Sequence, residues 1–215
     1  MADVAVKICG ITTLEAQDAA ITAGAGYLGY VFYPRSPRAI VPADAAALAR
    51  RVPPAVQRVG LLVDPDDAQL QALLAAVPLE ILQCHGRETP ERLAQIRALT
   101  GRRVMKALSI AGVDDFQQVP AFAAVADLLL FDARPPATSQ ALPGGNGIAF
   151  DWHLLHGRTG PQPWMLAGGL TPDSVATAIR IARPPVVDVS SGVESSPGRK
   201  DPARIRAFLA AVAAA

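Results

Sequence analysis

Two side chains in this sequence could form an acid–base pair, Cys9 and Asp132. Cys9 ends a short apolar run and follows Lys7 by two residues. A thiol near a cation can lose its proton more readily and act as a base. Asp132 comes directly after the apolar run DLLLF. A carboxyl group at the end of a buried strand is partly desolvated, which favours its protonated, acidic form. The residues therefore suggest general acid–base chemistry on a small molecule.

Each of these residues also has a structural interpretation, which local sequence leaves open. A free cysteine is most often a small buried hydrophobe, and Asp132 could simply begin a loop or pair with Arg134. His85 could act as an acid or base, although a hydrogen-bonded structural histidine is more common. Cys84 is out of phase with Gln83 and His85. Because side chains alternate along a strand, we expect Cys84 to face the helices and to be structural.

Three turns rich in glycine and serine could bind a phosphate group. Glycine lets the backbone approach a ligand, and free N–H groups there attract anions. The GGNG segment lacks the G-x-G-x-x-G spacing of a dinucleotide site. We therefore predict a phosphate site rather than a nucleotide cofactor site. The candidate residues are Gly145, Gly147, Gly168, Gly169, Ser190, Ser191 and Gly192.

A segment stiffened by prolines, YPRSPR, presents Arg35 and Arg38. A planar guanidinium group suits a substrate carboxylate, but two solvated surface arginines fit the sequence equally well. His153 and His156 are three residues apart, yet no nearby carboxylate or cysteine completes a set of metal ligands. We therefore predict no metal site.

The elements that must position these residues follow a repeating pattern. Short β-branched runs alternate with Ala- and Leu-rich segments of helical period. Starts of the predicted strands lie 23 to 29 residues apart, except for one interval of 36. Eight such units close into a barrel, whereas open doubly wound sheets usually stop at five or six strands. We predict a single-domain (β/α)8 TIM barrel over residues 1–215, with strands at 4–9, 27–33, 56–63, 79–83, 103–108, 127–131, 163–167 and 186–190.

In such a barrel, polar residues at the carboxyl ends of the strands are candidates for function. Strands one and six lie nearly opposite each other, so a small ligand could fit between Cys9 and Asp132. Lys7 shares a face with Cys9 because side chains alternate along a strand. Asp188 lies on the last strand, which neighbours the first in a closed barrel. We hypothesise that Lys7 and Asp188 interact there and help to set the charge state of Cys9.

Helix signals agree with this arrangement. Thr171-Pro172 and Asp201-Pro202 each predict a helix start, with a capping side chain followed by proline at the first helical position. Residues 133–148 form a sixteen-residue segment rich in Pro, Gly, Ser and Asn. Loops of this length in compact domains are usually functional or disordered, and we expect a mobile active-site loop.

Composition narrows the function further. The chain has 20 basic and 19 acidic residues and a net charge of +1, so we expect no nucleic-acid partner. We read no export signal at the N-terminus, and the C-terminal AFLAAVAAA is too short to span a membrane. The two cysteines give no disulfide framework. We therefore expect a cytoplasmic protein with reduced thiols and no membrane partner.

Taken together, several motifs resemble the phosphoribosylanthranilate isomerase family of tryptophan biosynthesis. The resemblance runs through the whole chain in order, and the combination is specific to that family. The motifs that carry it are KICGIT at 7–12, FYP and SPR at 32–38, GNG and FDW at 145–152, LAGGL at 166–170, and DVSSGVE with KD at 188–201.

This resemblance implies an Amadori rearrangement of N-(5′-phosphoribosyl)anthranilate. By position, Asp132 corresponds to the family's general acid and Cys9 to its general base. Arg38 corresponds to the residue that would hold the anthranilate carboxylate, and the Gly/Ser turns to the phosphate site. The reaction passes through an iminium that acidifies the proton to be removed, so we expect no cofactor. The expected partner is a small sugar-phosphate substrate.

Two departures from the family pattern stand out: Cys84 where a leucine is usual, and Asn146 where a threonine or serine is usual. Two other functions are considered. A histidine-pathway isomerase would need paired aspartates, which Cys9 argues against. A non-catalytic phosphate-binding barrel would not need both Cys9 and Asp132. The sequence leaves open whether the chain is a monomer or a homodimer, the resting protonation states of the pair, and any second substrate.

Overall fold

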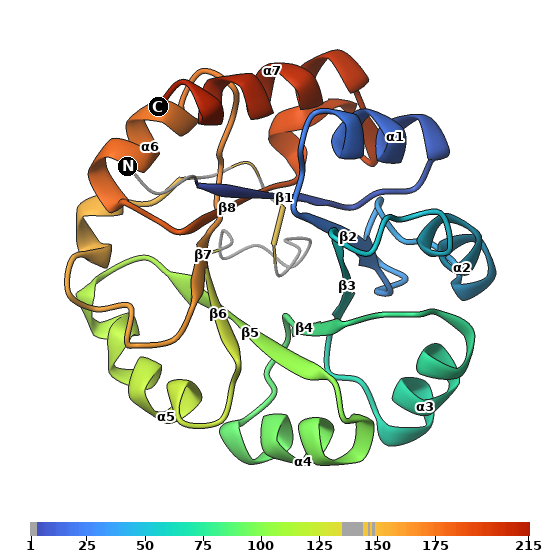
Figure 1. Ribbon diagram of the computed structural model, residues 1–215. Coiled ribbons are helices and arrows are strands. Elements are labelled where there is room, and N and C mark those ends of the chain that lie inside the picture. The colour runs from blue at the N-terminus through green and yellow to red at the C-terminus, as the bar shows by residue number, and fades with distance from the viewer. Residues whose placement is uncertain (1–3, 135–143, 146, 148) are drawn as a thin grey trace.

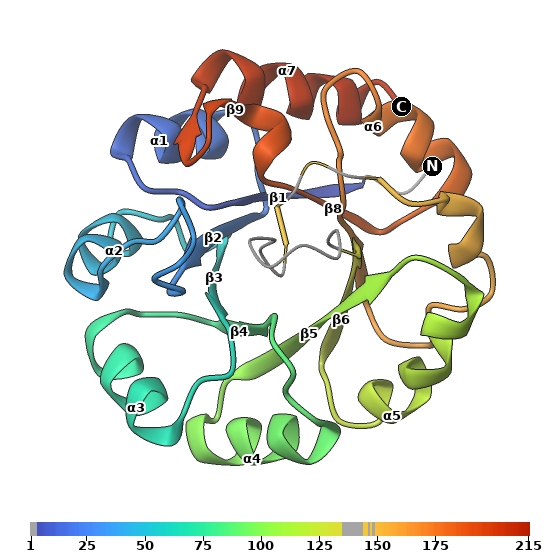
Figure 2. The same ribbon diagram turned by 180° about the vertical axis from the view of Figure 1, so that it is seen from behind.

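Eight parallel strands close into a barrel in chain order, and helices surround it (Figures 1 and 2). The computed structural model describes residues 4–134, 144–145, 147 and 149–215. Each strand pairs with the next one along the chain, and the last pairs with the first. The predicted (β/α)8 barrel is therefore confirmed. The strands are β1 (Ala5–Cys9), β2 (Tyr27–Val31), β3 (Gln57–Leu62), β4 (Ile81–Cys84), β5 (Arg103–Ile110), β6 (Leu128–Ala133), β7 (Trp164–Leu166) and β8 (Val186–Val189).

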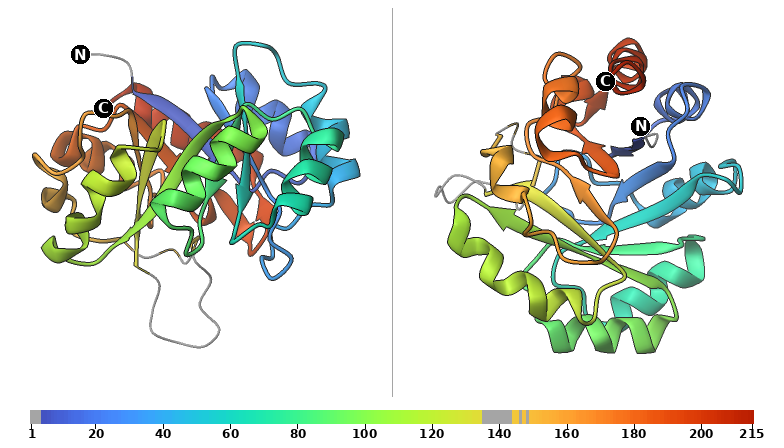
Figure 3. Two further views of the ribbon diagram at one scale, coloured as in Figure 1. Left: turned by 90° about the horizontal axis from the view of Figure 1, so that it is seen from below. Right: turned by 60° about the vertical axis from the view of Figure 1, so that its left-hand side comes forward.

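Helices connect the strands on the outside of the barrel, as the side views show (Figure 3). After β6, the described residues hold a short 3-10 helix, η2 (Trp152–Leu155), in place of an α-helix. Two other 3-10 helices are η1 (Val113–Gln118) and η3 (Ser191–Val193). The α-helices are α1 (Leu14–Thr22), α2 (Pro42–Ala49), α3 (Asp67–Ala76), α4 (Pro90–Thr100), α5 (Val119–Ala123), α6 (Val175–Ala182) and α7 (Pro202–Ala213).

All eight strands lie within a few residues of their predicted positions. One difference bears on the site: β6 extends to Ala133, so Asp132 is inside the strand rather than after it. Its backbone is held by β5, because Asp132 pairs in register with Ser109. The pairing continues past the apolar run, so hydropathy alone placed the strand end too early.

The core has two layers, which the two faces of the strands create. Side chains that point inward fill the barrel, and side chains that point outward pack under the helices. Cys84 is fully buried in the outer layer, as its phase on β4 predicts. The buried residues of the inner layer are Val59, Ile81, Met105, Ala107, Leu128, Leu130, Met165, Ala167 and Val186.

One of the two predicted helix starts is confirmed and the other is wrong. Asp201 caps α7 by accepting hydrogen bonds from Ala203 N at 2.8 Å and Arg204 N at 3.3 Å. Thr171 does not cap α6, which begins at Val175. Instead its side chain accepts a hydrogen bond from Ser174 N at 3.2 Å and forms a turn before the helix. A Thr-Pro pair fits such a turn as well as a helix start.

A small antiparallel hairpin, β9 (Glu194–Ser196) and β10 (Arg199–Lys200), follows η3 at the carboxyl end of β8. Figure 2 shows β9 beside α1 and α7. The chain then enters α7, which packs against α1 and so covers the join between β8 and β1. Within the described residues, no helix combines the length and apolar character needed to cross a membrane.

Candidate active site

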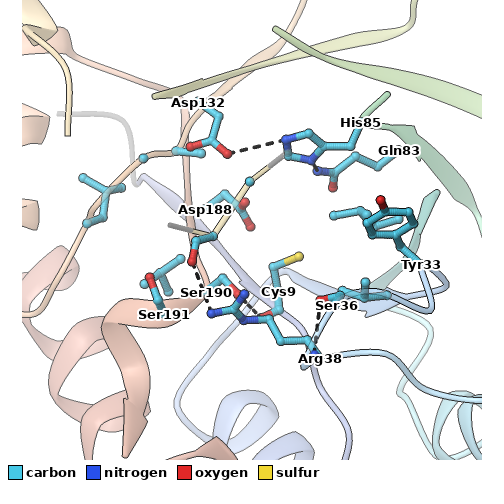
Figure 4. A pocket seen from close by; sticks show the side chains of 18 of the residues that line it. Cys9, Tyr33, Ser36, Arg38, Gln83, His85, Asp132, Asp188, Ser190 and Ser191 are labelled. Atoms are coloured by element: carbon cyan, nitrogen blue, oxygen red, sulfur yellow. Dashed lines mark hydrogen bonds and ion pairs between the residues drawn. The ribbon is translucent and has the colours of Figure 1, made fainter. Parts of the chain in front are cut away.

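A pocket opens at the carboxyl ends of the barrel strands and is partly open to solvent. Figure 4 shows its polar side chains, with Asp132 and His85 facing the pocket from one side and Cys9 and Arg38 from another. The side chains that line it are Cys9, Val31, Tyr33, Ser36, Arg38, Leu61, Val63, Gln83, His85, Asp132, Ala167, Leu170, Asp188, Val189, Ser190 and Ser191, together with Gly144, Gly145, Gly168 and Gly169.

Alternation along the strands explains why these polar groups converge. Asp132 follows Leu128 and Leu130 at intervals of two, and both leucines belong to the inner core layer. Asp188 follows Val186 of the same layer in the same way. β6 and β8 therefore each point apolar side chains into the barrel interior and one acidic side chain into the barrel mouth.

Cys9 and Lys7 lie side by side on β1, as predicted. Lys7 is fully buried, and its Nζ donates to Asp188 Oδ1 across 2.9 Å, so the predicted contact between strands one and eight is confirmed. Gly29 on the neighbouring strand leaves room for both groups. A Cβ atom at Gly29 would lie 2.9 Å from Cys9 Sγ and 3.3 Å from Lys7 Nζ. A larger residue there would push the thiol and the ammonium group apart.

Burial and charge act in opposite directions on these groups. Burial raises the pKa of the Cys9 thiol, and it outweighs the lowering effect of the Lys7 charge. Asp188 raises the pKa of Cys9 further. Burial alone would lower the pKa of Lys7, but Asp188 and Cys9 raise it above its ordinary value. A lone cation near Cys9 is therefore not enough to favour the thiolate, in contrast to the expectation from sequence.

Asp132 contacts a histidine rather than an arginine. Its Oδ2 lies 3.5 Å from His85 Nε2, and its Oδ1 accepts a hydrogen bond from Ala133 N at 2.8 Å. His85 Nδ1 is 3.2 Å from Gln83 Nε2. Arg134 pairs with Asp115 instead, so the alternative pairing with Asp132 is wrong. His85 is 8% exposed and lines the pocket beside the carboxyl group.

Arg38 is buried and lines the pocket, so it is not a solvated surface arginine. Its Nε and Nη2 donate to the two carboxylate oxygens of Glu194, at 2.7 and 2.9 Å. Its Nη2 also donates to the carbonyl of Gly145 at 3.3 Å. Arg35 of the same segment is exposed and does not line the pocket. The proline-stiffened segment therefore brings one guanidinium group to the site.

The glycine and serine turns predicted after β7 and β8 lie at the ends of those strands, and Gly144 and Gly145, further along the chain from β6, line the same pocket. Gly168 has a φ of +89°, and a Cβ atom there would lie 2.7 Å from Ala133 N, so a side chain would crowd the end of β6. Ser190 Oγ donates to the carbonyl of Cys9 at 3.1 Å. Gly192 and Gly147 do not line the pocket. A side chain at Gly192 would collide with the carbonyl group of Leu170, so this glycine allows the last two turns to pack together.

Other polar candidates lie away from the pocket. His153 pairs with Asp151 at 2.8 Å, and His156 Nε2 is 2.6 Å from the carbonyl of Ile181; both histidines are exposed. Among the residues that the structure describes, no group of three or more His, Cys, Asp or Glu side chains could hold a metal ion. Asn146 and most of the predicted mobile loop lie outside the described residues.

Sequence reasoning missed several residues of the site. Gln83 could have been found, because it shares a strand face with His85. Gly29 carries no local signal, since its importance comes from a thiol and an amine on another strand. Glu194 and Lys200 follow the end of β8 by several residues, and their charges look like ordinary surface charges until the hairpin is folded.

Comparison with known proteins identifies close relatives. The family model of N-(5′-phosphoribosyl)anthranilate (PRA) isomerase matches residues 6–211. The isomerase of that name from Paracoccus denitrificans is 56% identical over 207 residues, which cover 96% of each chain. That from Rhodospirillum centenum is 54% identical over 211 residues, 98% of this chain and 99% of the other.

Solved structures agree with these matches. Phosphoribosyl anthranilate isomerase from Thermotoga maritima superimposes with a TM-score of 0.88 at 36% identity, covering 99% of this chain and all of that one. Another solved isomerase was crystallised in complex with reduced 1-(o-carboxyphenylamino)-1-deoxyribulose 5-phosphate. It has a TM-score of 0.85 at 34% identity, with the same coverage.

Proposed function

The chain belongs to the N-(5′-phosphoribosyl)anthranilate isomerase family, and from this premise we propose that Asp132 and Cys9 are its general acid and general base. The activity itself is the Amadori rearrangement of N-(5′-phosphoribosyl)anthranilate to 1-(2-carboxyphenylamino)-1-deoxyribulose 5-phosphate, in tryptophan biosynthesis. The observation that carries the residue assignment is that both side chains face one pocket from strands three places apart in the barrel.

In the first step, Asp132 donates its proton to the ring oxygen of the ribose. The bond between C1′ and this oxygen breaks, and the anilino nitrogen supplies the electrons that form the iminium. The acid must carry a proton before substrate reacts. Asp132 is buried beneath Gly144 and beside His85, so its carboxyl group faces the pocket and is positioned to deliver that proton there.

In the second step, Cys9 removes the proton from C2′ as a thiolate. The electrons of the C–H bond neutralise the iminium, and the resulting enolamine rearranges to the amino ketone. Lys7 and Asp188 adjust the charge of Cys9 from the barrel interior, and His85 supports Asp132 at 3.5 Å. A proton transfer of this kind contributes about 10²- to 10⁴-fold to the rate of an enzyme.

The two ends of the substrate are bound by different parts of the mouth. Arg38 holds the anthranilate carboxylate. Backbone N–H groups of the turns after β6, β7 and β8 bind the phosphate, at the pocket-lining residues Gly145, Gly168, Gly169, Ser190 and Ser191. Gly147 and Gly192 do not line the pocket and act by shaping these turns. Fixing both ends places the sugar between acid and base, so that remote binding energy accelerates the chemical step.

Single substitutions test this assignment. In Cys9→Ala and in Asp132→Asn, kcat for phosphoribosylanthranilate should fall by about 10²-fold or more, with a smaller change in KM. Loss of substrate fluorescence measures the rate. Cys84→Ala and Asp127→Asn are matched controls. Cys84 is buried in the outer core layer and Asp127 pairs with Arg97, so both should keep a near wild-type kcat. Retention of kcat in either site variant would remove that residue from its role.

We also propose that one chain, as a single domain over residues 1–215, contains the complete site, whether the protein is a monomer or a homodimer. The described residues of one chain bring Cys9, Asp132 and Arg38 to a single pocket. The solved Thermotoga maritima enzyme is described as dimeric. If the protein forms a dimer, its specific activity should stay constant when dilution dissociates that dimer, as followed by sedimentation.

The two buried free thiols support a cytoplasmic location.

A further inference from the structure

Glu194 contacts two cations that belong to different parts of the site. Its side chain is 4% exposed and accepts hydrogen bonds from Arg38 and from Lys200 Nζ, the latter at 2.7 Å. The backbone N–H of Gly198 adds a further bond at 3.2 Å. Burial alone would raise the pKa of Glu194, but Arg38 and Lys200 outweigh it and lower the pKa, so the carboxylate stays charged near neutral pH. Such a group can move only by leaving buried charges unpaired.

Lys200 connects Glu194 to the phosphate turn and to the base. Its Nζ donates to the carbonyl of Ser190 at 2.9 Å and lies 3.3 Å from Ser190 Oγ. Ser190 Oγ in turn donates to the backbone carbonyl of Cys9. The position of Glu194 is therefore transmitted through two side chains to the end of β1 and to the turn after β8.

Arg38 connects the same carboxylate to the other end of the substrate. Glu194 occupies the edge of the guanidinium group formed by Nε and Nη2. The opposite nitrogen, Nη1, faces Gly145 and forms no hydrogen bond with the described residues. The stem of Arg38 lies against Gly10, where a Cβ atom would be 2.9 Å from Arg38 Cδ. The orientation of the guanidinium group is thus set from two sides, by Glu194 and by the backbone that follows Cys9.

The hairpin β9–β10 is packed so that it can keep these groups together. Its Gly198 has a φ of +81° and lies directly against the carbonyl of Pro37, where a side chain would collide. Pro37 directly precedes Arg38. The hairpin therefore lies on the loop after β2, while its first and last residues, Glu194 and Lys200, supply the buried ion pair.

We propose that Glu194 is a positioning residue that fixes the distance between Arg38 and Lys200. It thereby keeps the groups that bind the carboxylate and phosphate ends of the substrate at a constant distance from each other and from Cys9. This inference rests on the proposed roles of Arg38 and the phosphate turns. Glu194 does not line the pocket, so it acts through its two partners and does not touch the substrate.

The test compares two ligands that differ only in the group that Arg38 binds. One is reduced 1-(o-carboxyphenylamino)-1-deoxyribulose 5-phosphate, and the other is the same compound without the carboxylate. The ratio of their dissociation constants, measured by calorimetry, reports how well Arg38 is oriented. In Glu194→Gln this ratio should fall about tenfold, because a single amide oxygen cannot orient both cations. Glu80→Gln, which frees Arg58 at the barrel wall away from the pocket, should leave it unchanged.

A second variant separates the two ion pairs of Glu194, one with Arg38 and one with Lys200. Lys200→Met keeps the pair between Glu194 and Arg38, so both ligands should weaken by the same factor of about ten and their ratio should stay as in the wild type. It also provides the test if Glu194→Gln does not fold. An unchanged ratio in folded Glu194→Gln, or no weakening of either ligand in Lys200→Met, would overturn the inference. A wild-type chain that fails to turn over phosphoribosylanthranilate would instead contradict the isomerase activity.

Discussion

Cys9 lies between opposing influences that together decide when it can act as a base. Burial raises its pKa, Lys7 lowers it, and Asp188 raises it. The residue that supplies the helpful charge is itself tied to a carboxylate at 2.9 Å. Thiolate formation therefore depends on Lys7 and Asp188 together, since their charges act on Cys9 in opposite directions.

The pH dependence of catalysis follows from this balance. If Cys9 is the base, as proposed, its thiolate is the active form, and kcat/KM should rise as pH increases through the raised pKa of Cys9. Lys7→Met removes the charge that lowers this pKa, so the rising limb should move to higher pH. Arg58→Met, which removes a cation paired with Glu80 away from the pocket, should leave the limb in place. An unchanged profile in Lys7→Met would show that Lys7 does not set the charge of Cys9.

Gly29 tests whether the thiol and the ammonium group must lie side by side. The added methyl group in Gly29→Ala would sit 2.9 Å from Cys9 Sγ and force it to move. Displacements of about 1 Å at a reacting group can cost up to 10²-fold, so we expect kcat to fall by about 10- to 100-fold. Gly112→Ala is the control, since its Cβ would meet no atom within 4 Å. Steady-state kinetics compare kcat of the two variants with that of the wild type. An unchanged kcat in Gly29→Ala would exclude a steric role for Gly29.

At the scale of the elements, the loops that follow β3 and β4 are held by a buried ion pair. Glu88 accepts hydrogen bonds from the backbone N–H groups of Asp64 at 2.8 Å and Gly86 at 2.9 Å. Lys106 on β5 completes the cluster, with its Nζ 2.6 Å from Glu88. Gly86 directly follows His85, so this cluster also supports the side chain that contacts Asp132.

Breaking this cluster should destabilise the fold. Glu88→Gln leaves Lys106 buried without a charged partner, and such changes cost about 3–5 kcal/mol in the free energy of unfolding. Urea denaturation followed by circular dichroism measures the loss. Glu91→Gln, in the exposed first turn of α4, provides the control and should leave the midpoint unchanged. A stability equal to the wild type in Glu88→Gln would mean that the backbone bonds alone hold the loops.

At the scale of the whole molecule, closure of the barrel joins the two ends of the chain. β8 pairs with β1, and α7 packs against α1. The site depends on this closure, because Lys7 from one end meets Asp188 from the other. Both loops that carry Arg38 and Glu194 then meet over the same barrel mouth.

Because no strand can leave the barrel without opening it, we expect residues 1–215 to unfold as one unit. The midpoints of urea unfolding should coincide when measured by far-ultraviolet circular dichroism and by fluorescence of Trp152 and Trp164. Two separate transitions would show instead that part of the barrel unfolds independently and would contradict the single-domain prediction.

Sequence alone determined the barrel and the face of each strand. Period-two alternation is a local property, and it correctly placed Lys7 on the inner face of β1 with Cys9 and Cys84 on the outer face of β4. Neighbouring strands in a closed ring also follow from their order, so the contact between Lys7 and Asp188 was predictable. The regular spacing of apolar runs was sufficient because each βα unit repeats the same local pattern.

Only the tertiary structure decided how these groups affect one another. The pKa of Cys9 depends on how deeply the folded barrel buries it, which the residue types near it in sequence do not report. Arg38 and Glu194 are 156 positions apart, so their contact exists only once the hairpin lies on the loop after β2. Local patterns determine which side chains enter the barrel mouth, whereas burial and contacts between distant segments determine their charge and orientation.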